Sequence, residues 1–385
     1  MTCNPASVVL IGVLLSGCVS SPGQHELRGA ASVAEISEVP FFAQDDYQCG
    51  PAALATVLVH GGVSVTPDQL VSQIYVPGRR GSLQAELLAT TRSHARVPYR
   101  LDGSWRSLLA ELHDGRPVLL LQNLGFDRWP IWHYAVLVGF DAEQRTFLLR
   151  SGTESRHEVS VSRLLASWER AGSWAMVAVP ASEPPASAEA LGWLQAVAPF
   201  ESTGRVATAA EGYTAGVKRW PKDPLVWTAL GNVSYLQQDF AAAERAYGQA
   251  LSLSPGHWPA RNNLLQTFMA RGCPGLAMPF LGHDGEPPAD FSATWNRTLE
   301  GLAAMDESQC QAVQPSSSAG RGAVVDRNLV KRPLKSATHG DQKETTDGCG
   351  GAENEVPGRR VCEATGKGFD HLFTHALRRL IAQEE

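Results

Sequence analysis

Residues 49 to 58 read Cys49-Gly50-Pro51-Ala52-Ala53-Leu54-Ala55-Thr56-Val57-Leu58 and predict a helix that begins at or just after the cysteine. Proline is favoured in a first helical turn, and the Ala/Leu spacing continues the helix. A helix N-terminus favours negative charge, so a thiol there is expected to ionise more readily, and the thiolate is the nucleophile. A lone cysteine is more often a small buried apolar residue. The helix start and the following Gly-Pro favour a catalytic Cys49 over that alternative.

A second stretch carries a histidine into an apolar run. It reads His133-Tyr134-Ala135-Val136-Leu137-Val138-Gly139-Phe140 and predicts a buried strand that begins at the histidine. Trp129, Pro130 and Trp132 precede this strand, and these flanks distinguish His133 among the 11 histidines of the chain. We expect His133 to act as a general base. The alternative is a core histidine without a chemical role.

A glutamine stands five residues before the cysteine. The side-chain amide of Gln44 can donate to a developing oxyanion, together with the backbone N–H of Cys49. Asp45 and Asp46, which follow it, are interpreted as a solvated turn. A thiol at a helix start, a histidine on a strand and an oxyanion donor are together the parts of a papain-type cysteine hydrolase.

Residues 40–180 resemble the bacteriocin-processing (double-glycine leader) peptidase family and its papain-like relatives. Members carry a glutamine, then Cys-Gly-Pro-Ala-Ala, then a His-Tyr strand that ends in Gly-Phe or Gly-Tyr. The resemblance implies an α+β papain-like fold, in which one early helix packs under a later antiparallel sheet. It also implies a cysteine peptidase that acts on a peptide or protein substrate. In many relatives the glutamine lies six residues before the cysteine, against five here.

The third catalytic position departs from this pattern. Relatives place an aspartate at the end of the strand after the histidine strand, where this chain has Arg150 followed by Ser151. Ser151 is expected to orient the imidazole only weakly, and Asp141 lies at the far end of the histidine strand. Because no carboxylate lies at this position, the prediction is a Cys49–His133 dyad. By analogy with the serine triad, loss of the third group lowers the rate by up to ~10⁴-fold, but cysteine enzymes depend mainly on the thiolate–imidazolium pair. A weak or inactive peptide-binding module, or another acyl-transfer reaction, stays open.

The remaining elements follow from hydrophobic periodicity. In the first domain we expect helices at 50–60, 67–74, 82–93 and 104–114, and strands at 117–123, 133–140, 145–150 and 174–179. Residues 181–189 form a Pro/Ser-rich linker.

An internal repeat with a period of 34 residues follows the linker. The repeated positions pair as Trp193 with Trp227, Ala209 with Ala243, Tyr213 with Tyr247 and Pro221 with Pro255. The pattern resembles the tetratricopeptide repeat, although Ser234 stands where a tyrosine is usual. The resemblance implies an all-α region over 190–290 that recruits a protein partner. The alternative is an unrelated helical bundle.

The N-terminus resembles a bacterial lipoprotein signal. Residues 8–15 are apolar but too few to span a bilayer, and they lead into the lipobox-like Leu15-Ser16-Gly17-Cys18. By resemblance, Cys18 is the lipidation site, 1–18 a signal peptide and 19–39 a tether. Val19 in place of aspartate favours the outer membrane and a periplasm-facing protein. No Lys or Arg precedes Arg28, so the basic segment of such signals is missing; the alternative is an apolar strand that ends in cysteine.

Other classes find no support. The net charge of -6 offers no basic surface for nucleic acid. Zinc-ligand spacings and a Gly-rich phosphate loop are missing from the sequence, so we expect no metal, nucleotide or other cofactor.

Cys273 and Cys310 are a candidate disulfide in an oxidising compartment. Residues 311–368 are expected to be disordered, and 369–385 to form a short amphipathic helix.

Overall fold

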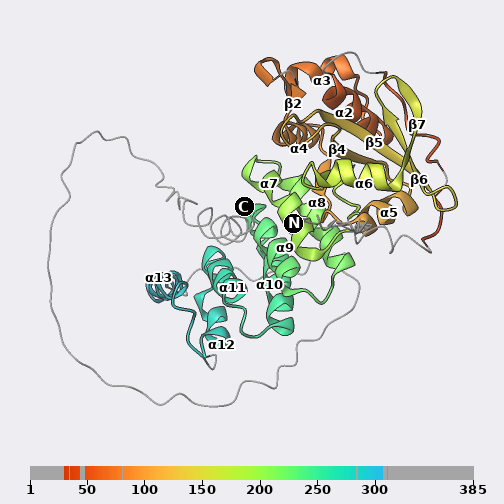
Figure 1. Cartoon of the computed structure of the whole chain (residues 1–385). Coiled ribbons are helices and arrows are strands. Elements are labelled where there is room, and N and C mark those ends of the chain that lie inside the picture. The colour runs from red at the N-terminus through yellow and green to blue at the C-terminus, as the bar shows by residue number, and fades with distance from the viewer. Residues whose placement is uncertain are drawn as a thin grey trace, which may run out of the picture. The chain divides into compact units, whose positions relative to one another are not determined.

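The computed structural model describes residues 30–33, 35–43, 48–79, 81–282, 285–306 and 310 (Figure 1). Gln44 and Cys18 lie outside these residues, as do the predicted signal peptide and the segments 311–368 and 369–385. The predictions about them stay predictions. Within the described residues, no helix combines the length and the apolar character that crossing a membrane requires.

The predicted helices of the first domain are present, and the first begins at the cysteine itself. Their bounds are α2 Cys49–His60, α3 Pro67–Ile74, α4 Gln84–Ser93 and α5 Trp105–His113. Pro51 stands in the first turn of α2, where its missing N–H leaves no helical bond unmade. A capping box formed by Thr66 and Gln69 starts α3, and Ser104 accepts a hydrogen bond from the backbone N–H of Ser107 at the start of α5.

Six of the described strands form one antiparallel sheet, in the order β3 (Val97–Arg100), β8, β4, β5, β6 and β7 (Glu154–Ser160). Tyr75–Val76 and Gly81–Ser82 pair as a separate two-stranded sheet. The predicted strands are β4 Val118–Asn123, β5 Trp132–Asp141, β6 Thr146–Ser151 and β8 Ala175–Val179. Helix α2 packs across β5 and its neighbours, while α5 and α6 (Val161–Glu169) contact β4 from the other side of the sheet in Figure 1. The α+β layout expected for residues 40–180 is confirmed.

Sequence periodicity missed α6 and several strands: β1 Tyr75–Val76, β2 Gly81–Ser82, β3 Val97–Arg100 and β7 Glu154–Ser160. Strands β3 and β7 are the two edges of the sheet. Edge strands tolerate proline and charge, and they need no alternating apolar pattern. Accordingly β3 holds Pro98, and β7 buries Val159 alone among its residues.

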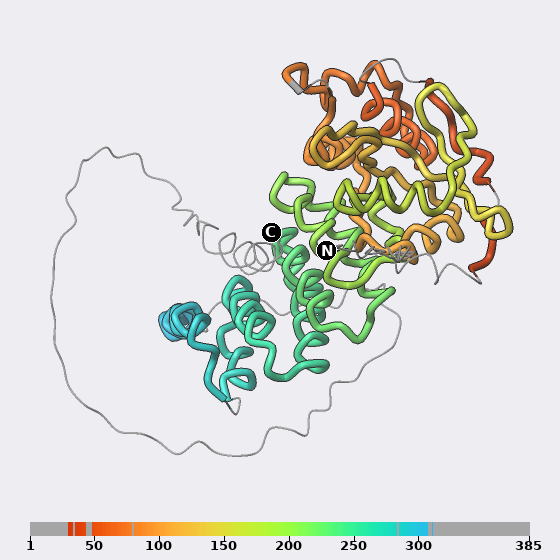
Figure 2. The backbone as a smooth tube through the Cα atoms, in the orientation of Figure 1, coloured from red at the N-terminus to blue at the C-terminus, as the bar shows by residue number. Residues whose placement is uncertain are grey.

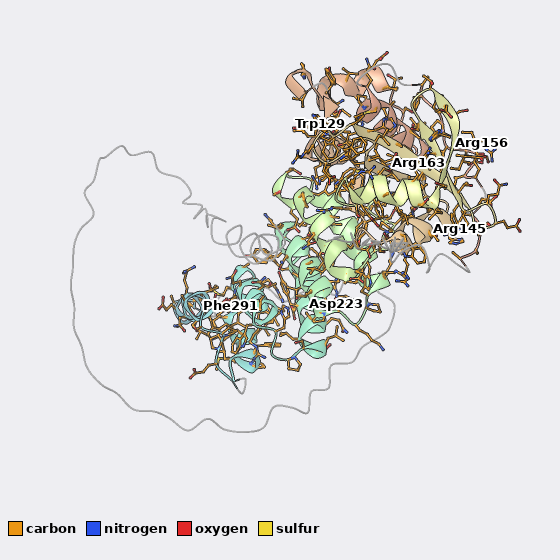
Figure 3. All side chains as sticks on the ribbon, in the orientation of Figure 1. Trp129, Arg145, Arg156, Arg163, Asp223 and Phe291 are labelled. Carbon is orange, nitrogen blue, oxygen red and sulfur yellow. A yellow bond between two sulfur atoms is a disulfide. The ribbon has the colours of Figure 1, made fainter. Side chains whose placement is uncertain are left out.

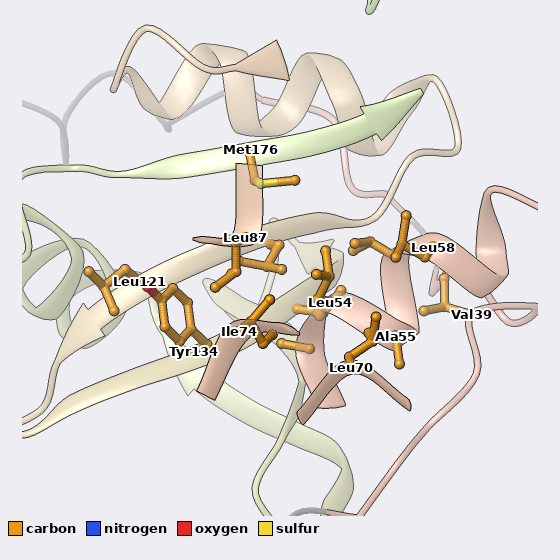
Figure 4. Packing of buried hydrophobic residues seen from close by; sticks show 14 of the residues in the cluster. Val39, Leu54, Ala55, Leu58, Leu70, Ile74, Leu87, Leu121, Tyr134 and Met176 are labelled. Atoms are coloured by element: carbon orange, nitrogen blue, oxygen red, sulfur yellow. The ribbon is translucent and has the colours of Figure 1, made fainter. Parts of the chain in front are cut away.

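The core of the first domain fixes α2 against the sheet. Leu54 and Leu58 of α2 are fully buried, and they share a cluster with Tyr134 of β5 and Met176 of β8 (Figure 4). Burial of a leucine side chain contributes about 1.5–3 kcal/mol. The packing therefore holds the helix that carries Cys49 in a defined position beside the strand that carries His133.

An N-terminal strap, made of residues 30–33 and 35–43, lies along the sheet. The backbones of Val33 and Phe140 exchange hydrogen bonds of 2.8 and 3.0 Å. Glu35 forms ion pairs with Arg150 at 2.7 Å and with Arg156 at 3.1 Å. Arg150, which is 7% exposed, also donates to the carbonyl oxygen of Ser155 at 2.6 Å. The arginine at the end of β6 thus serves to hold the strap.

The described residues of 190–282 and 285–303 contain helices and the turns between them, which Figure 2 shows following the strands along the chain. They are α7 Ala190–Ser202, α8 Val206–Arg219, α9 Pro224–Leu236, α10 Phe240–Leu253, α11 Trp258–Ala270, the 3₁₀ turn η2 Pro274–Ala277, α12 Met278–Leu281 and α13 Ser292–Ala303. The repeated positions Trp193, Tyr213 and Tyr247 are fully buried. A Cβ on Gly231 would lie 2.4 Å from the Tyr247 ring, so the small residue is needed where α9 and α10 cross. The all-α region is confirmed, whereas its assignment as tetratricopeptide repeats stays a prediction. The candidate disulfide between Cys273 and Cys310 is formed.

Candidate active site

Cys49 is the first residue of α2 and is half-buried against the core cluster. Among the described cysteines it is the one without a disulfide. Backbone hydrogen bonds from Tyr134, Gly50 and Cys49 itself reach its sulfur. The thiol therefore sits where the N-terminus of α2 meets the start of β5.

Burial raises the pKa of the Cys49 thiol above its ordinary value, because a thiolate loses hydration there. The backbone hydrogen bonds act in the opposite direction but do not outweigh burial. The N–H groups at the start of α2 thus lower this pKa as expected, but burial outweighs them and the net pKa is raised. A raised pKa favours the neutral thiol, which needs a base to become a nucleophile.

His133 is the second residue of β5, and its register partner on β4 is Gln122. Its Nε2 lies 2.8 Å from Oγ of Ser151, the last residue of β6. A register shift between Leu149 and Ser151 marks a bulge in the pairing of β6 with β7. Bulges redirect side chains. The irregular backbone at this end of β6 thus accompanies the approach of the serine to the imidazole.

The structure separates the two candidates for the third position. Ser151 is hydrogen-bonded to His133, whereas Asp141 closes the turn at the far end of β5. There the Asp141 Oδ1 accepts the backbone N–H groups of Glu143 and Gln144, both at 2.9 Å. Asp141 is therefore a turn-capping residue, and Ser151 is the partner of the histidine.

The pKa of His133 is lowered, first by burial and second by the nearby His157. His157 in turn bonds Glu154 through Nδ1 at 3.0 Å. Ser151, the hydrogen-bond partner of His133, is neutral and stabilises a protonated His133 only weakly. Within the described residues, no hydrogen bond joins the Cys49 thiol directly to His133. Burial thus favours the neutral form of both the thiol and the imidazole in the free site. Apo sites of this kind often tighten only around a substrate.

Ser82 is a site neighbour that the sequence reasoning missed. A Cβ on Gly50 would lie 2.4 Å from its Oγ, so β2 packs directly on the first turn of α2. This hydroxyl is buried and finds no hydrogen-bond partner within the described residues. The Tyr134 hydroxyl donates to the Ser82 carbonyl oxygen at 3.2 Å. Ser82 therefore contacts both Gly50, the residue after Cys49, and Tyr134, the residue after His133. The sequence feature that could have indicated this close packing is the glycine at position 50.

In the described part of the chain, no group of three or more His, Cys, Asp or Glu side chains could hold a metal ion. The chemistry available to these residues is proton transfer and nucleophilic attack by sulfur.

Part of the chain is similar to a known protein family. Residues 36–176 match the Peptidase_C39 like family, from the strap to β8. The matched part is thus a C39-like, papain-like α+β domain, a class that suggests cysteine peptidase function. No curated protein matches the chain.

Three solved structures are similar to part of the chain. A C39-like peptidase from Bacillus anthracis has 20% identity and a TM-score of 0.33, covering 39% of this chain and 98% of its own. A double glycine motif protease from an AMS/PCAT transporter, solved with its leader peptide, has 17% identity and a TM-score of 0.30, covering 39% and 99%. The peptidase domain of Streptococcus ComA, a bifunctional ABC transporter, has 17% identity and a TM-score of 0.31, covering 37% and 99%.

Proposed function

We propose that this protein is a cysteine peptidase that hydrolyses peptide bonds through Cys49 and His133, with Ser151 holding the imidazole. The observation that carries the proposal is the 2.8 Å contact between His133 Nε2 and Ser151 Oγ, in a domain whose nucleophile candidate opens α2. When Nε2–H of His133 donates a hydrogen bond to the Ser151 oxygen, Nδ1 carries the lone pair and can act as the base.

The reaction starts from the neutral pair. His133 takes the thiol proton at Nδ1 as Sγ attacks the carbonyl carbon of the scissile bond. The backbone N–H of Cys49 and the amide of Gln44 donate to the oxyanion. His133 then gives its proton to the leaving amine, and a thioester remains on Cys49. Water, deprotonated by the same imidazole, attacks the thioester and releases the new carboxyl terminus and the thiol.

The segments outside this domain would anchor the protein at a membrane and recruit its substrate or partner. The lipobox-like segment ending in Cys18 supports lipid anchoring at the outer membrane with the domain facing the periplasm. The 34-residue period and the buried tyrosines of the helical region support tetratricopeptide repeats that recruit a protein partner or substrate.

A second function is favoured by the electrostatics of the same site. Burial raises the pKa of Cys49 and lowers that of His133, and the imidazole is paired with a neutral serine. A papain-like domain with such a site can bind peptides without cutting them. The chain would then be a peptide-binding scaffold.

Peptide hydrolysis separates the two functions. The full chain is incubated with a mixture of proteome-derived peptides, and new termini are read by mass spectrometry beside Cys49→Ala and His133→Ala controls. A peptidase generates termini that vanish in Cys49→Ala and fall by at least ~10²-fold in His133→Ala. A peptidyl acyloxymethyl ketone should also label Cys49 in a His133-dependent way. No new termini and no such labelling would leave the scaffold function.

A further inference from the structure

The loop between β4 and β5 presents large apolar side chains to solvent directly before His133. Phe126 is 77% exposed and Trp129 is 73% exposed, and three neighbours are more than half exposed. We call this set the apolar loop; its members are Leu124, Phe126, Trp129, Ile131 and Trp132. Soluble proteins rarely leave such side chains clustered without a partner. Figure 3 labels Trp129 in this loop and Arg145 in the loop at the other end of β5.

The apolar loop is ordered by its own hydrogen bonds. Phe126 and Trp129 exchange backbone hydrogen bonds of 3.2 and 3.0 Å, and the N–H of Leu124 donates to Ile131 at 2.9 Å. The buried Asn123 side chain accepts the N–H groups of Gly125 and Ile131, both at 3.0 Å. A surface fixed in advance loses little entropy when it binds. The backbone that carries the exposed rings is therefore ordered before any ligand binds.

The surface is hollowed and carries positive charge. A cavity of about 530 Å³ is lined by Leu124, Phe126 and Trp129 together with Asp127, Arg128 and Arg170. The Arg170 guanidinium donates to the carbonyl oxygen of Asn123 at 2.9 Å, which fixes it beside the rings. No carboxylate of the described residues forms an ion pair with either arginine. The cavity thus offers apolar contact and, with two guanidinium groups against the one carboxylate of Asp127, a net positive charge that favours a bound carboxylate.

We propose that the apolar loop binds the segment of the substrate peptide next to the scissile bond, and selects segments that combine bulky apolar side chains with a carboxylate. Trp129 lies four residues before His133, so at most ~14 Å of extended chain separates them. An extended peptide covers that distance with ~4 residues. Continuity with the candidate base, the hollow and the two arginines favour a peptide over a flat lipid surface. The inference rests on the proposed function, whose site it extends.

The test uses the full chain with Cys49→Ala, so that bound peptides are not cut. It is applied to an array of short random peptides, alone and with Phe126→Ser, Trp129→Ser and Ile131→Ser added together. The matched control adds Leu225→Ser and Met278→Ser, which remove apolar side chains exposed by 44% and 64% in the helical region. We expect bound peptides to be enriched in Leu, Ile, Phe and Trp with an Asp or Glu. The loop variant should lose at least ~10-fold in binding, and the control should not.

A charge-reversal variant provides a second measurement. Arg128→Glu should shift the preference of the array from acidic toward basic peptides. Equal binding by the loop variant and its control, or no binding to the array at all, would overturn the proposal. So would a loop variant that keeps peptide binding but loses co-sedimentation with phosphatidylethanolamine/phosphatidylglycerol vesicles, because the apolar loop would then contact lipid. If the loop variant binds peptides normally but self-associates more weakly in sedimentation equilibrium, the apolar loop contacts a second copy of the chain and the proposal is overturned.

Failure of the inference can be told apart from failure of the proposed function. His133-dependent labelling of Cys49, measured in loop variants that retain the cysteine, reports on the catalytic pair alone. If that labelling is intact and array binding does not depend on the loop, the substrate surface lies elsewhere. If array binding depends on the loop but no labelling or hydrolysis occurs, the peptidase function fails and the peptide surface stands.

Discussion

The Oγ of Ser151 lies 2.8 Å from the Nε2 of His133 and gives the imidazole a neutral partner. A carboxylate at this distance would stabilise the imidazolium and draw the thiol proton toward the histidine. A serine can fix the tautomer and the ring orientation but adds no charge. The contact therefore orders the imidazole without offsetting burial and the nearby His157, which lower the pKa of His133.

Replacing this partner should change the titration of His133 in a defined direction. In Ser151→Asp the new carboxylate should raise the pKa of His133 by ~1–3 units, and Ser151→Asn should leave the pKa below its ordinary value. NMR titration of the His133 ring measures this directly. Ser151→Ala should reduce kcat for peptide hydrolysis, by less than the ~10⁴-fold lost with a triad carboxylate. An unchanged pKa in Ser151→Asp would place the carboxylate out of reach of Nε2.

The reactivity of Cys49 should follow a neutral thiol. Burial raises its pKa, so the iodoacetamide alkylation rate should climb with pH beyond the ~8.5 of a free cysteine. A thiolate–imidazolium pair would instead give a high rate that is already level in weakly acidic solution. Alkylation of Cys49 is read from its tryptic peptide, and the disulfide-bonded Cys273 and Cys310 do not compete. A level rate between weakly acidic and neutral pH would show that the pair is ionised.

The sequence predicted the parts of the site that depend on local pattern. A helix start at Cys49 follows from Gly-Pro and the alanines, and a buried strand after His133 follows from its apolar run. Neither depends on the rest of the fold. The same is true of the long helices of the 190–290 region, where apolar spacing is regular.

What the sequence could not predict depends on tertiary structure. The sequence named Ser151 as a candidate to orient His133, but no local signal in the residues around Ser151 specifies the bulged end of β6 where the two residues meet. The raised pKa of Cys49 is set by burial, which a helix start alone does not reveal. The packing of Ser82 on Gly50 joins segments far apart in sequence through a two-residue strand.

The strap should add stability that depends on the ionised Glu35. Arg150 and Arg156 lower the pKa of Glu35, so the unfolded chain binds its proton more readily than the folded one. The contribution is complete above the unfolded pKa of ~4.3 and is lost as pH falls through the lower folded value. Glu35→Gln should lower the free energy of unfolding at pH ~7 by about 1–3 kcal/mol, and by less in acid. Urea unfolding at both pH values measures this.

Arg156 supplies the control for that prediction. Its side chain is 62% exposed, against 8% for Arg150, although both pair with Glu35. An exposed ion pair contributes about 0–1 kcal/mol, so Arg156→Ala should have little effect. Equal losses in Glu35→Gln at neutral and acidic pH would contradict a role for the charge.

The closest constraint on the nucleophile is the contact of Gly50 with Ser82. A Cβ at residue 50 would lie 2.4 Å from the Ser82 Oγ and 2.6 Å from its Cβ, so Gly50→Ala must move β2 or the start of α2. Displacing a reacting group by ~1 Å can cost 10²-fold in rate, and we expect a loss of kcat/KM of that order. Ser82→Gly removes both clashing atoms, so Gly50→Ala with Ser82→Gly should regain most of the activity. Peptide hydrolysis and thermal unfolding of the single and double variants measure this. A Gly50→Ala variant with unchanged activity, or a double variant no better than the single one, would show that the contact does not position Cys49.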